Sequence, residues 1–421
     1  MSKSLSLSRL SALVAGEGVA VRVRQRLQPA GGAGDKVFPP TYATGDRALK
    51  YAGETRRIEG QDVPCVLLDS VASQANRMEE ALQDAWDRRL LDFPLIGVDF
   101  SGDPDLADIG VITTLQAPHR IADAILRDAT DTKGKTLFRD LPEGKAFTSA
   151  TFRNASAVFQ LCPTALVFGV WDSTGPKGGM GAKFQRTLTG EIVAVGASAG
   201  RKVSSRLDPL GIQANVPVYH SAEDTDDWTI DIALAAKDAK GKPRAFSRGG
   251  KSEGGKASAV NHSNIAPSID ELAGGVTFDY ATQSVVFSLA ALRRLRFVTT
   301  MDGEELKNAD AAAGAARAAL AALGLAAVVF ARQGGYDLRS RCLLVPDGPL
   351  VMEAVLGDGS IETFSLSTGD VATMLKEAAA AAGAAGLPWV REPVKLKPAP
   401  KLASLVKASR AQAAAGLADV D

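Results

Sequence analysis

Small polar side chains gather at the start of a helix that the sequence predicts over residues 70–91. The segment 68–80 reads LDSVASQANRMEE, in which Ser70, Gln74 and Arg77 are spaced three and four residues apart. Side chains at that spacing share one side of a helix and can act together. Hydroxyl, amide and guanidinium groups at a helix start suit a phosphate or the edge of a base. The other interpretation stays open, because such residues often serve only as caps and surface cover.

The densest glycine segment spans residues 171–190 and carries Lys177, Lys183 and Arg186 in the sequence WDSTGPKGGMGAKFQRTLTG. Glycine leaves backbone N–H groups unobstructed, so such a loop can wrap closely around an anionic backbone. A mobile hairpin loop without a ligand is the alternative. The segment is not a nucleotide-binding P-loop, and the GKT and GKS triplets elsewhere in the chain lack the first glycine of that motif.

Residues able to perform acid–base, nucleophilic or metal chemistry are few and scattered. The three histidines and three cysteines show neither metal-ligand spacing nor a CxxC pair, so we expect no zinc site and no disulfide framework. Asp69, Asp99 and Asp172 each follow a strand-like run, where catalytic carboxylates often lie, but buried caps are commoner there. We therefore expect no catalytic residue, no metal ion and no cofactor.

The charge of the chain is balanced overall but uneven along its length. Its 421 residues hold 48 basic and 48 acidic side chains, which argues against a uniformly basic nucleic-acid binder. Basic residues dominate 174–207 and acidic residues dominate 79–108, a pattern that suits a polyanion on one side and like copies on another. No apolar run reaches the roughly 18 residues of a membrane span, and the start of the chain has no convincing signal-peptide core. We expect a cytoplasmic protein without a membrane partner.

The strand that would position a basic surface is the clearest local prediction. Val19, Val21 and Val23 alternate with residues that include Arg22 and Arg24, a period of two that predicts one aliphatic and one basic face. Lys36 follows in a loop, close to two aromatic residues. Phosphate contacts from such Lys and Arg side chains provide affinity without sequence choice.

Strands and helices mingle along the rest of the chain without a steady βαβα rhythm, which indicates an α+β domain with long insertions. Further strands are expected at 63–69, 164–171, 191–195, 228–235, 275–280, 284–289, 325–331, 341–346 and 350–356, and further helices at 119–128, 304–323 and 368–385. Residues 237–262 have the composition of a flexible loop, and the basic tail 391–421 that of an extended arm.

Several segments together resemble the backbone subunit of a type I CRISPR effector complex, a RAMP-superfamily protein of the Cascade subtype I-G, formerly I-U. They run in order from about residue 38 to 345 and are FPPTY (38–42), YAGE (51–54), LLDSVASQANRMEEAL (67–82), HRIADA (119–124), LVFGVWDSTGPKGGMGAKFQR (166–186), IAPS (265–268), GGVTF (274–278), AALRRLRF (290–297) and GYDLRSRC (335–342). The resemblance implies a modified RRM-like, ferredoxin-like palm over residues 1–390, with large insertions that form fingers and a thumb.

The resemblance also implies a function and a set of partners. Copies of such a subunit stack head to tail as a filament on CRISPR RNA, the guide pairs with target DNA, and other effector-complex subunits join them in antiviral defence. For contacts with the guide backbone we select, from residue type and motif placement, Gln74, Asn76, Arg77, Lys177, Lys183 and Arg186, with Arg22, Arg24 and Lys36 as second choices.

Two other functions stay open from the sequence. One is a metal-dependent target-RNA endonuclease of type III-like character, which would cut with a loop aspartate. The other is a stand-alone RNA-binding protein or nucleotide-dependent enzyme outside CRISPR systems.

Overall fold

The computed structural model describes residues 3–45, 48–175, 181–224, 226–247 and 255–414, and the chain divides into two compact units. The first unit draws on Met1–Tyr42, Tyr51–Ser198 and Val276–Lys407, and the second on Ala43–Lys50, Ala199–Gly275 and Ala408–Asp421.

A large sheet forms the centre of the first unit, and its strands run in the order β1-β21-β20-β2-β17-β10-β4-β3, with β19 pairing the end of β2 and β18 pairing β19. All neighbours are antiparallel except β1 and β21. The strands are β1 (Lys3–Ser4), β2 (Gly18–Pro29), β3 (Gly53–Ile58), β4 (Gln61–Asp69), β10 (Leu188–Val195), β17 (Tyr280–Ser288), β18 (Tyr336–Arg339), β19 (Cys342–Pro346), β20 (Met352–Leu356) and β21 (Ile361–Ser365).

The middle of this sheet has the chain order of an RRM-like fold. Strand β2 precedes helix α2 (Val71–Asp87), β10 and β17 follow, and helix α8 (Ala309–Gly334) leads to β20. These four strands lie side by side in the order β20-β2-β17-β10. Strand–helix–strand–strand–helix–strand is the ferredoxin-like pattern, to which β3 and β4 add one edge and β1 and β21 the other. The predicted α+β class is confirmed.

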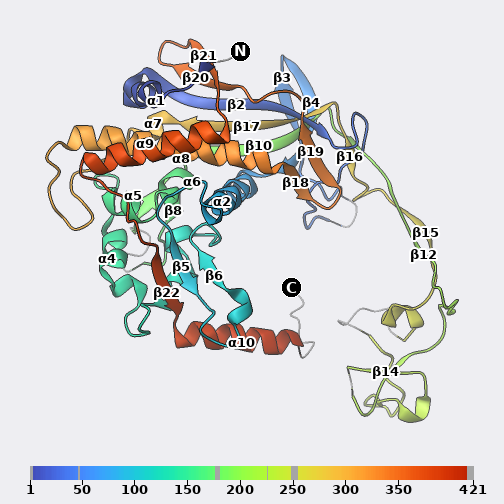
Figure 1. Cartoon of the computed structure of the whole chain (residues 1–421). Coiled ribbons are helices and arrows are strands. Elements are labelled where there is room, and N and C mark those ends of the chain that lie inside the picture. Colours follow the sequence, from blue (N-terminus) through green and yellow to red (C-terminus); the bar gives the residue numbers. More distant parts are fainter. Residues whose placement is uncertain (1–2, 46–47, 176–180, 225, 248–254, 415–421) are drawn as a thin grey trace. The chain divides into compact units, whose positions relative to one another are not determined.

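Helices cover the face of the sheet on which the apolar side chains of β2 lie. Val21, Val23 and Leu27 of β2 are buried, whereas Arg24 and Arg26 between them are exposed on the other face. Figure 1 shows α8 and α9 (Thr368–Ala384) side by side below the sheet. Helix α1 (Leu7–Ala12), the π-helical segment Leu13–Glu17 and α7 (Leu289–Leu292) complete this layer.

Helix α8 is the core helix of the first unit. It is long and apolar enough to cross a membrane, but 83% of its most apolar window is buried inside the protein, as in the core helix of a soluble protein. Gly324 allows a close approach to the sheet, because a Cβ there would lie 2.6 Å from the ring of Phe287.

The remainder of the first unit contains a second, four-stranded sheet in the order β6-β5-β22-β7. Its strands are β5 (Ile96–Asp99), β6 (Val111–Thr113), β7 (Ala129–Thr130) and β22 (Val394–Pro398). Around it lie α3 (Ala124–Arg127), α4 (Pro142–Ser149), α5 (Ser156–Leu161), α6 (Thr164–Phe168), the hairpin of β8 (Val170–Trp171) and β9 (Lys183–Phe184), and 3-10 turns at Ala107–Ile109, Arg120–Ala122 and Phe138–Asp140.

The tail differs from the extended arm that its composition predicts. Strand β22 pairs in parallel with β5, and helix α10 (Pro400–Ala414) follows, with Lys407 contacting Asp103 at 2.9 Å and Asp105 at 2.8 Å. The acidic segment after α2 therefore attracts the basic tail.

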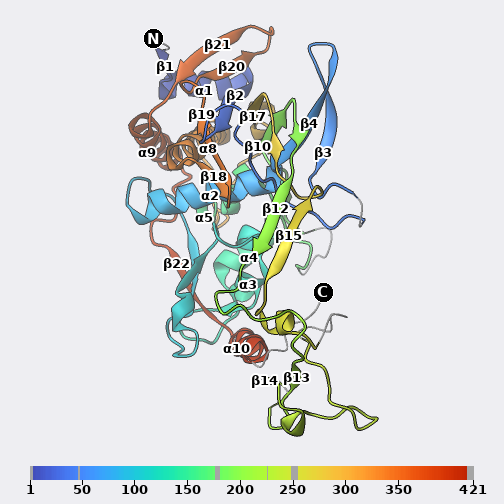
Figure 2. The same cartoon turned by 90° about the vertical axis from the view of Figure 1, so that its right-hand side faces the viewer.

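The second unit is built around a two-stranded antiparallel ribbon of β12 (Lys202–Arg206) and β15 (Ile265–Asp270), which lie side by side in Figure 2. Between these strands the chain forms the small hairpin of β13 (Tyr219–His220) and β14 (Trp228–Thr229), and 3-10 turns at Ile232–Leu234 and Ala257–Val260. Short strands β11 (Ser198–Ala199) and β16 (Val276–Thr277) lie where the chain passes from one unit to the other.

Some predicted elements are wrong, and two of the errors share a cause. Residues 325–331 were expected as a strand but continue α8, and 164–168 form α6 before the short β8. An apolar run that is buried on all sides carries no period, so it does not distinguish a buried strand from a buried helix. The predicted strand at 228–235 keeps only β14, and the predicted helix at 119–128 is a 3-10 turn followed by α3.

Candidate nucleic-acid interface

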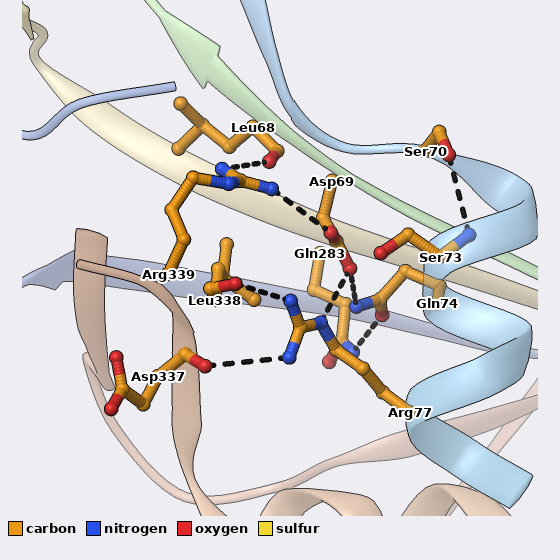
Figure 3. Close-up of polar contacts among 10 residues, drawn as sticks. All are labelled: Leu68, Asp69, Ser70, Ser73, Gln74, Arg77, Gln283, Asp337, Leu338 and Arg339. Atoms are coloured by element: carbon orange, nitrogen blue, oxygen red, sulfur yellow. Dashed lines mark hydrogen bonds and ion pairs between the residues drawn. The ribbon is translucent and has the colours of Figure 1, made fainter. Parts of the chain in front are cut away.

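Asp69, the last residue of β4, is fully buried and collects three side chains from two other elements. Gln74 Nε2 donates to Asp69 Oδ2 at 2.7 Å, and Arg77 Nε donates to the same oxygen at 3.0 Å. Arg339 Nη2, from β18, lies 3.5 Å from Oδ1 (Figure 3). One buried carboxylate is thus surrounded by two guanidinium groups and an amide, which keeps it paired and hydrogen-bonded.

The two arginines also bind main-chain carbonyl groups, which locks three elements together. Arg77 donates from Nη2 to Leu338 O at 2.5 Å and from Nη1 to Asp337 O at 3.3 Å, joining α2 to β18. Arg339 Nη1 donates to Leu68 O at 2.9 Å, joining β18 to β4 (Figure 3). Their side chains remain 28% and 27% exposed, so each guanidinium has one edge at the surface.

A chain of buried amides continues inward from this cluster. Gln283 Nε2 donates to Gln74 Oε1 at 2.8 Å, and the Tyr336 hydroxyl donates to Gln283 Oε1 at 2.8 Å. Burial raises the pKa of Tyr336 to about 12, so its hydroxyl stays protonated as a donor. Gln74 is only 2% exposed. The prediction that Gln74 contacts a guide backbone is corrected, because its amide is enclosed and fully engaged within the protein.

The other predicted residues of α2 have different surroundings. Ser70 caps the helix by accepting from Ser73 N at 3.3 Å, so the capping interpretation holds for it. Asn76 is exposed, and its side chain makes no hydrogen bond within the described part of the chain. Arg77 is half-buried, and its surface pocket also contains Glu80 and Asp84, which disfavour a phosphate there.

A basic and aromatic surface lies at the turn between β18 and β19. The guanidinium of Arg341 is 4.2 Å from the ring centroid of Phe38, and Lys36 Nζ is 5.6 Å from it. Phe38 N donates to Arg341 O at 3.0 Å, which fixes the loop 36–38 against this hairpin. Arg341 is exposed, and its backbone has a φ of +59°, as in a tight turn. We call Lys36, Phe38 and Arg341 the hairpin surface.

Sequence reasoning selected Lys36 but missed Arg339 and Arg341. Both belong to GYDLRSRC (335–342), one of the segments that carry the family resemblance. The alternation Asp-Leu-Arg-Ser-Arg was the available signal, because it places arginines opposite the buried Leu338 near a turn. Arg341 is exposed there, whereas Arg339 binds Asp69.

The open face of the large sheet carries the arginines of β2. Arg22 is paired with Glu353 of β20, and the Arg26 guanidinium lies 4.0 Å from the ring centroid of Tyr280. Arg24, between them, is exposed and has no ion-pair partner among the residues that the structure describes. Of the two arginines predicted on this strand, Arg24 is therefore the better placed to bind an anion.

The glycine-rich segment leaves from the β8–β9 hairpin. Lys183 Nζ lies 4.5 Å from the ring centroid of Trp171, and Arg186 is exposed two residues after β9. Buried Asp172 anchors the base of the segment, since it accepts from Arg139 Nη2 at 2.5 Å while Arg139 Nη1 donates to Thr174 O at 2.9 Å. Lys177 lies outside the described residues, so its prediction has no structural counterpart.

Inside the protein, helix α2 connects the side chains around Asp69 with the β8–β9 hairpin. Glu79 of this helix accepts two hydrogen bonds of 2.6 Å from buried Arg120, whose Nη1 donates to Gly169 O at 2.9 Å. The N-terminal end of α2 therefore supports Asp69 and the side chains bound to it, Gln74, Arg77 and Arg339, which we call the Asp69 cluster. The middle of α2 supports the start of β8.

The three cysteines, which the sequence predicts as core residues, lie inside the protein. Cys65, Cys162 and Cys342 are free and buried, and burial raises the pKa of Cys342 to about 11. Within the described ranges, no group of three or more His, Cys, Asp or Glu side chains is arranged to hold a metal ion.

Comparison with known proteins gives one family. Residues 21–199 match the model of a family described as CRISPR-associated protein GSU0053. The matched segment starts in β2 and includes β4, α2, the β8–β9 hairpin and β10, so it covers most of the groups described above. The match indicates a CRISPR-associated protein, which confirms that part of the resemblance. No curated protein matches the chain.

Proposed function

We propose that this chain is a non-catalytic, CRISPR RNA-binding backbone subunit of a type I effector complex of subtype I-G. Support comes from the CRISPR-associated family match and from the RRM-like strand order at the centre of the sheet. The observation that carries the proposal is the hairpin surface, Lys36, Phe38 and Arg341. Its hairpin is bound to the Asp69 cluster through Arg339. A CRISPR-associated protein is expected to associate with CRISPR RNA and with other CRISPR-associated subunits.

The hairpin surface has the chemistry that a single-stranded RNA backbone requires. Lys36 and Arg341 supply positive charge beside an aromatic ring, Phe38, which can contribute to stacking with a base. Arg339 is held by Asp69 beneath the same hairpin, so the hairpin does not need RNA to take its shape. Contacts of this type are independent of sequence, and target DNA is then read through pairing with the guide.

The second unit supports self-association along the RNA. Its β12–β15 ribbon exposes Val203 at 67%, Ile265 at 48% and Ile269 at 64%. A two-stranded ribbon has little stability alone, and exposed apolar surface of this kind marks an interaction site. In the proposal the ribbon belongs to the thumb and contacts a neighbouring copy in a head-to-tail filament.

The test is retention of RNA by a doubly charge-reversed variant. The chain is co-expressed with a CRISPR array and its partner subunits, and the bound RNA is extracted and measured. Lys36→Glu with Arg341→Glu is expected to lower retained RNA by about tenfold or more, as for several lost phosphate contacts. The control is Arg57→Glu with Lys376→Glu, which makes the same charge change at two other exposed positions. Equal retention by the two variants would contradict the assignment of the hairpin surface.

A further inference from the structure

Trp171 is an exposed tryptophan on a well-supported hairpin. Half of its surface, 50%, is accessible, although Val170 beside it is buried. Trp171 and Lys183 are register partners across β8 and β9, so their side chains share one face of the hairpin. The ammonium group of Lys183 lies 4.5 Å from the indole centroid. An exposed indole beside a cation is therefore a feature of the fold at this position.

The hairpin is fixed from below, which distinguishes this indole from one on a loose loop. Val170 and Phe184, the other register pair, are 7% and 3% exposed and point into the core. Asp172 directly after Trp171 is bound by Arg139, and Arg120 binds Gly169 O directly before the hairpin. The orientation of the indole is thus set by contacts on both sides of it in sequence.

A second exposed ring, that of Phe152, contacts the hairpin through Phe184, on the face opposite Trp171. Phe152 is 38% exposed, and its centroid is 5.2 Å from that of Phe184. Arg296 N donates to Phe152 O at 3.0 Å, which brings the segment AALRRLRF beside it. Arg153 and Arg296 are both exposed.

Exposed basic side chains lie on the segments around this hairpin. The three segments that meet here, 144–160, 181–190 and 280–301, contain no Asp or Glu. Lys183 and Arg186 come from the second of these segments, and Arg153 and Arg296 from the other two. Interleaved aromatic and basic side chains are the composition of surfaces that bind single-stranded nucleic acid, where bases stack on rings and cations hold phosphates.

We propose that Trp171 is a stacking platform for an unpaired base of single-stranded nucleic acid, with Lys183 binding the adjacent phosphate. This inference rests on the proposed function and deepens it, since it adds base contacts at a place distinct from the hairpin surface. The strand is either the guide RNA or a DNA strand, and both present the same base faces and phosphates.

The experiment uses the purified full chain and measures its affinity for oligouridylate RNA and oligothymidylate DNA. Trp171→Ala is expected to weaken binding by about tenfold, as for the loss of one stacked base, and Trp171→Tyr to stay within about threefold because it keeps a ring. Trp228→Ala is the matched control, since Trp228 is 42% exposed but belongs to the second unit. A loss confined to RNA assigns the platform to the guide, and a loss confined to DNA assigns it to a DNA strand.

Two outcomes separate the inference from the proposal on which it rests. If the wild-type chain binds and Trp171→Ala binds like Trp228→Ala, the stacking platform is wrong and the RNA-binding function stands. If the wild-type chain binds neither strand, the RNA-binding function itself is contradicted. A Trp171→Ala variant that changes only self-association, measured by sedimentation, would make this surface a protein contact and overturn the inference.

Discussion

Asp69 and Arg77 form an ion pair of 3.0 Å that joins the last residue of β4 to the second turn of α2. Asp69 has no exposed surface, whereas the Arg77 side chain is 28% exposed. The arginine therefore compensates a buried charge and presents only an edge to the outside. Its first role is to hold the end of the sheet to the helix. Replacement of Arg77 should therefore affect the stability of the fold before it affects binding.

Arg77→Glu is expected to destabilise the protein. A second carboxylate would lie beside buried Asp69 and two backbone carbonyls would lose their donor, so the free energy of unfolding should fall by about 3 kcal/mol or more. Urea unfolding followed by circular dichroism measures the change. Asn76→Glu is the control, because this neighbouring side chain is exposed. Equal stability of the two variants would show that the Asp69–Arg77 pair does not support the fold.

The sequence alone suggests a different result for Arg77. From residue type, charge reversal of Arg77 and Lys183 should remove RNA retention and leave the fold intact. The structure separates the two residues, since Arg77 is bound within the protein while Lys183 is exposed over Trp171. Charge reversal of Lys183 or of the hairpin surface therefore tests RNA binding with less damage to the fold than charge reversal of Arg77.

The close approach of α8 to the sheet provides a packing prediction. Gly324→Leu should lower the free energy of unfolding by about 1 to 3 kcal/mol or more, because even its Cβ would lie 2.6 Å from the Phe287 ring. Gly314→Ala in the same helix has no atom within 4 Å of the added Cβ and should raise stability by about 0.5 to 1 kcal/mol. Thermal unfolding of both variants gives the comparison, and a stabilising Gly324→Leu would contradict the helix–sheet packing.

Salt dependence tests how the hairpin surface binds RNA. The logarithm of the affinity for single-stranded RNA should fall linearly with the logarithm of salt concentration, with a slope of about 0.7 for each phosphate neutralised. Lys36→Ala with Arg341→Ala should reduce the magnitude of that slope by about 1.4. The slopes come from binding titrations at several salt concentrations. A variant with weaker binding but an unchanged slope would mean that these side chains do not contact phosphates.

The thiol beside the Asp69 cluster gives a prediction from its pKa. Burial raises the pKa of Cys342 to about 11, so almost no thiolate is present at neutral pH and the group is also shielded. Iodoacetamide at pH 8 should leave Cys342 unmodified in the native protein and alkylate it after urea unfolding. Mass spectrometry of peptides reads the result, and rapid native labelling would mean that this end of the sheet opens in solution.

Much of the sheet was accessible from sequence because its signals are local. The alternation of valine and arginine in β2 identifies both the strand and its basic face, and the Ser-capped, apolar-striped segment after β4 identifies α2. Helix α8 was predicted only in its first part, since an all-apolar continuation has no period. The ordering of the tail depends on contacts with residues about 300 positions earlier, such as Lys407 with Asp105, which no local pattern reveals.

The sequence predicted which residue types the candidate site contains, but not which groups their side chains contact. Gln74 and Arg77 have the chemistry of a phosphate contact, yet the nearest anion they meet is Asp69 of their own chain. Conversely, Arg341 acquires its position only when the β18–β19 hairpin meets the loop that carries Phe38, some 300 residues away in sequence. Burial and contacts between distant parts of the chain determine whether each of these side chains is available to a ligand.

The most direct test of the proposed function is electron microscopy of the chain co-expressed with a CRISPR array and its partner subunits, combined with extraction of the bound RNA. We predict a regular filament in which copies of this chain repeat along RNA of guide length. A monomer that purifies free of nucleic acid in the presence of the guide would contradict the account.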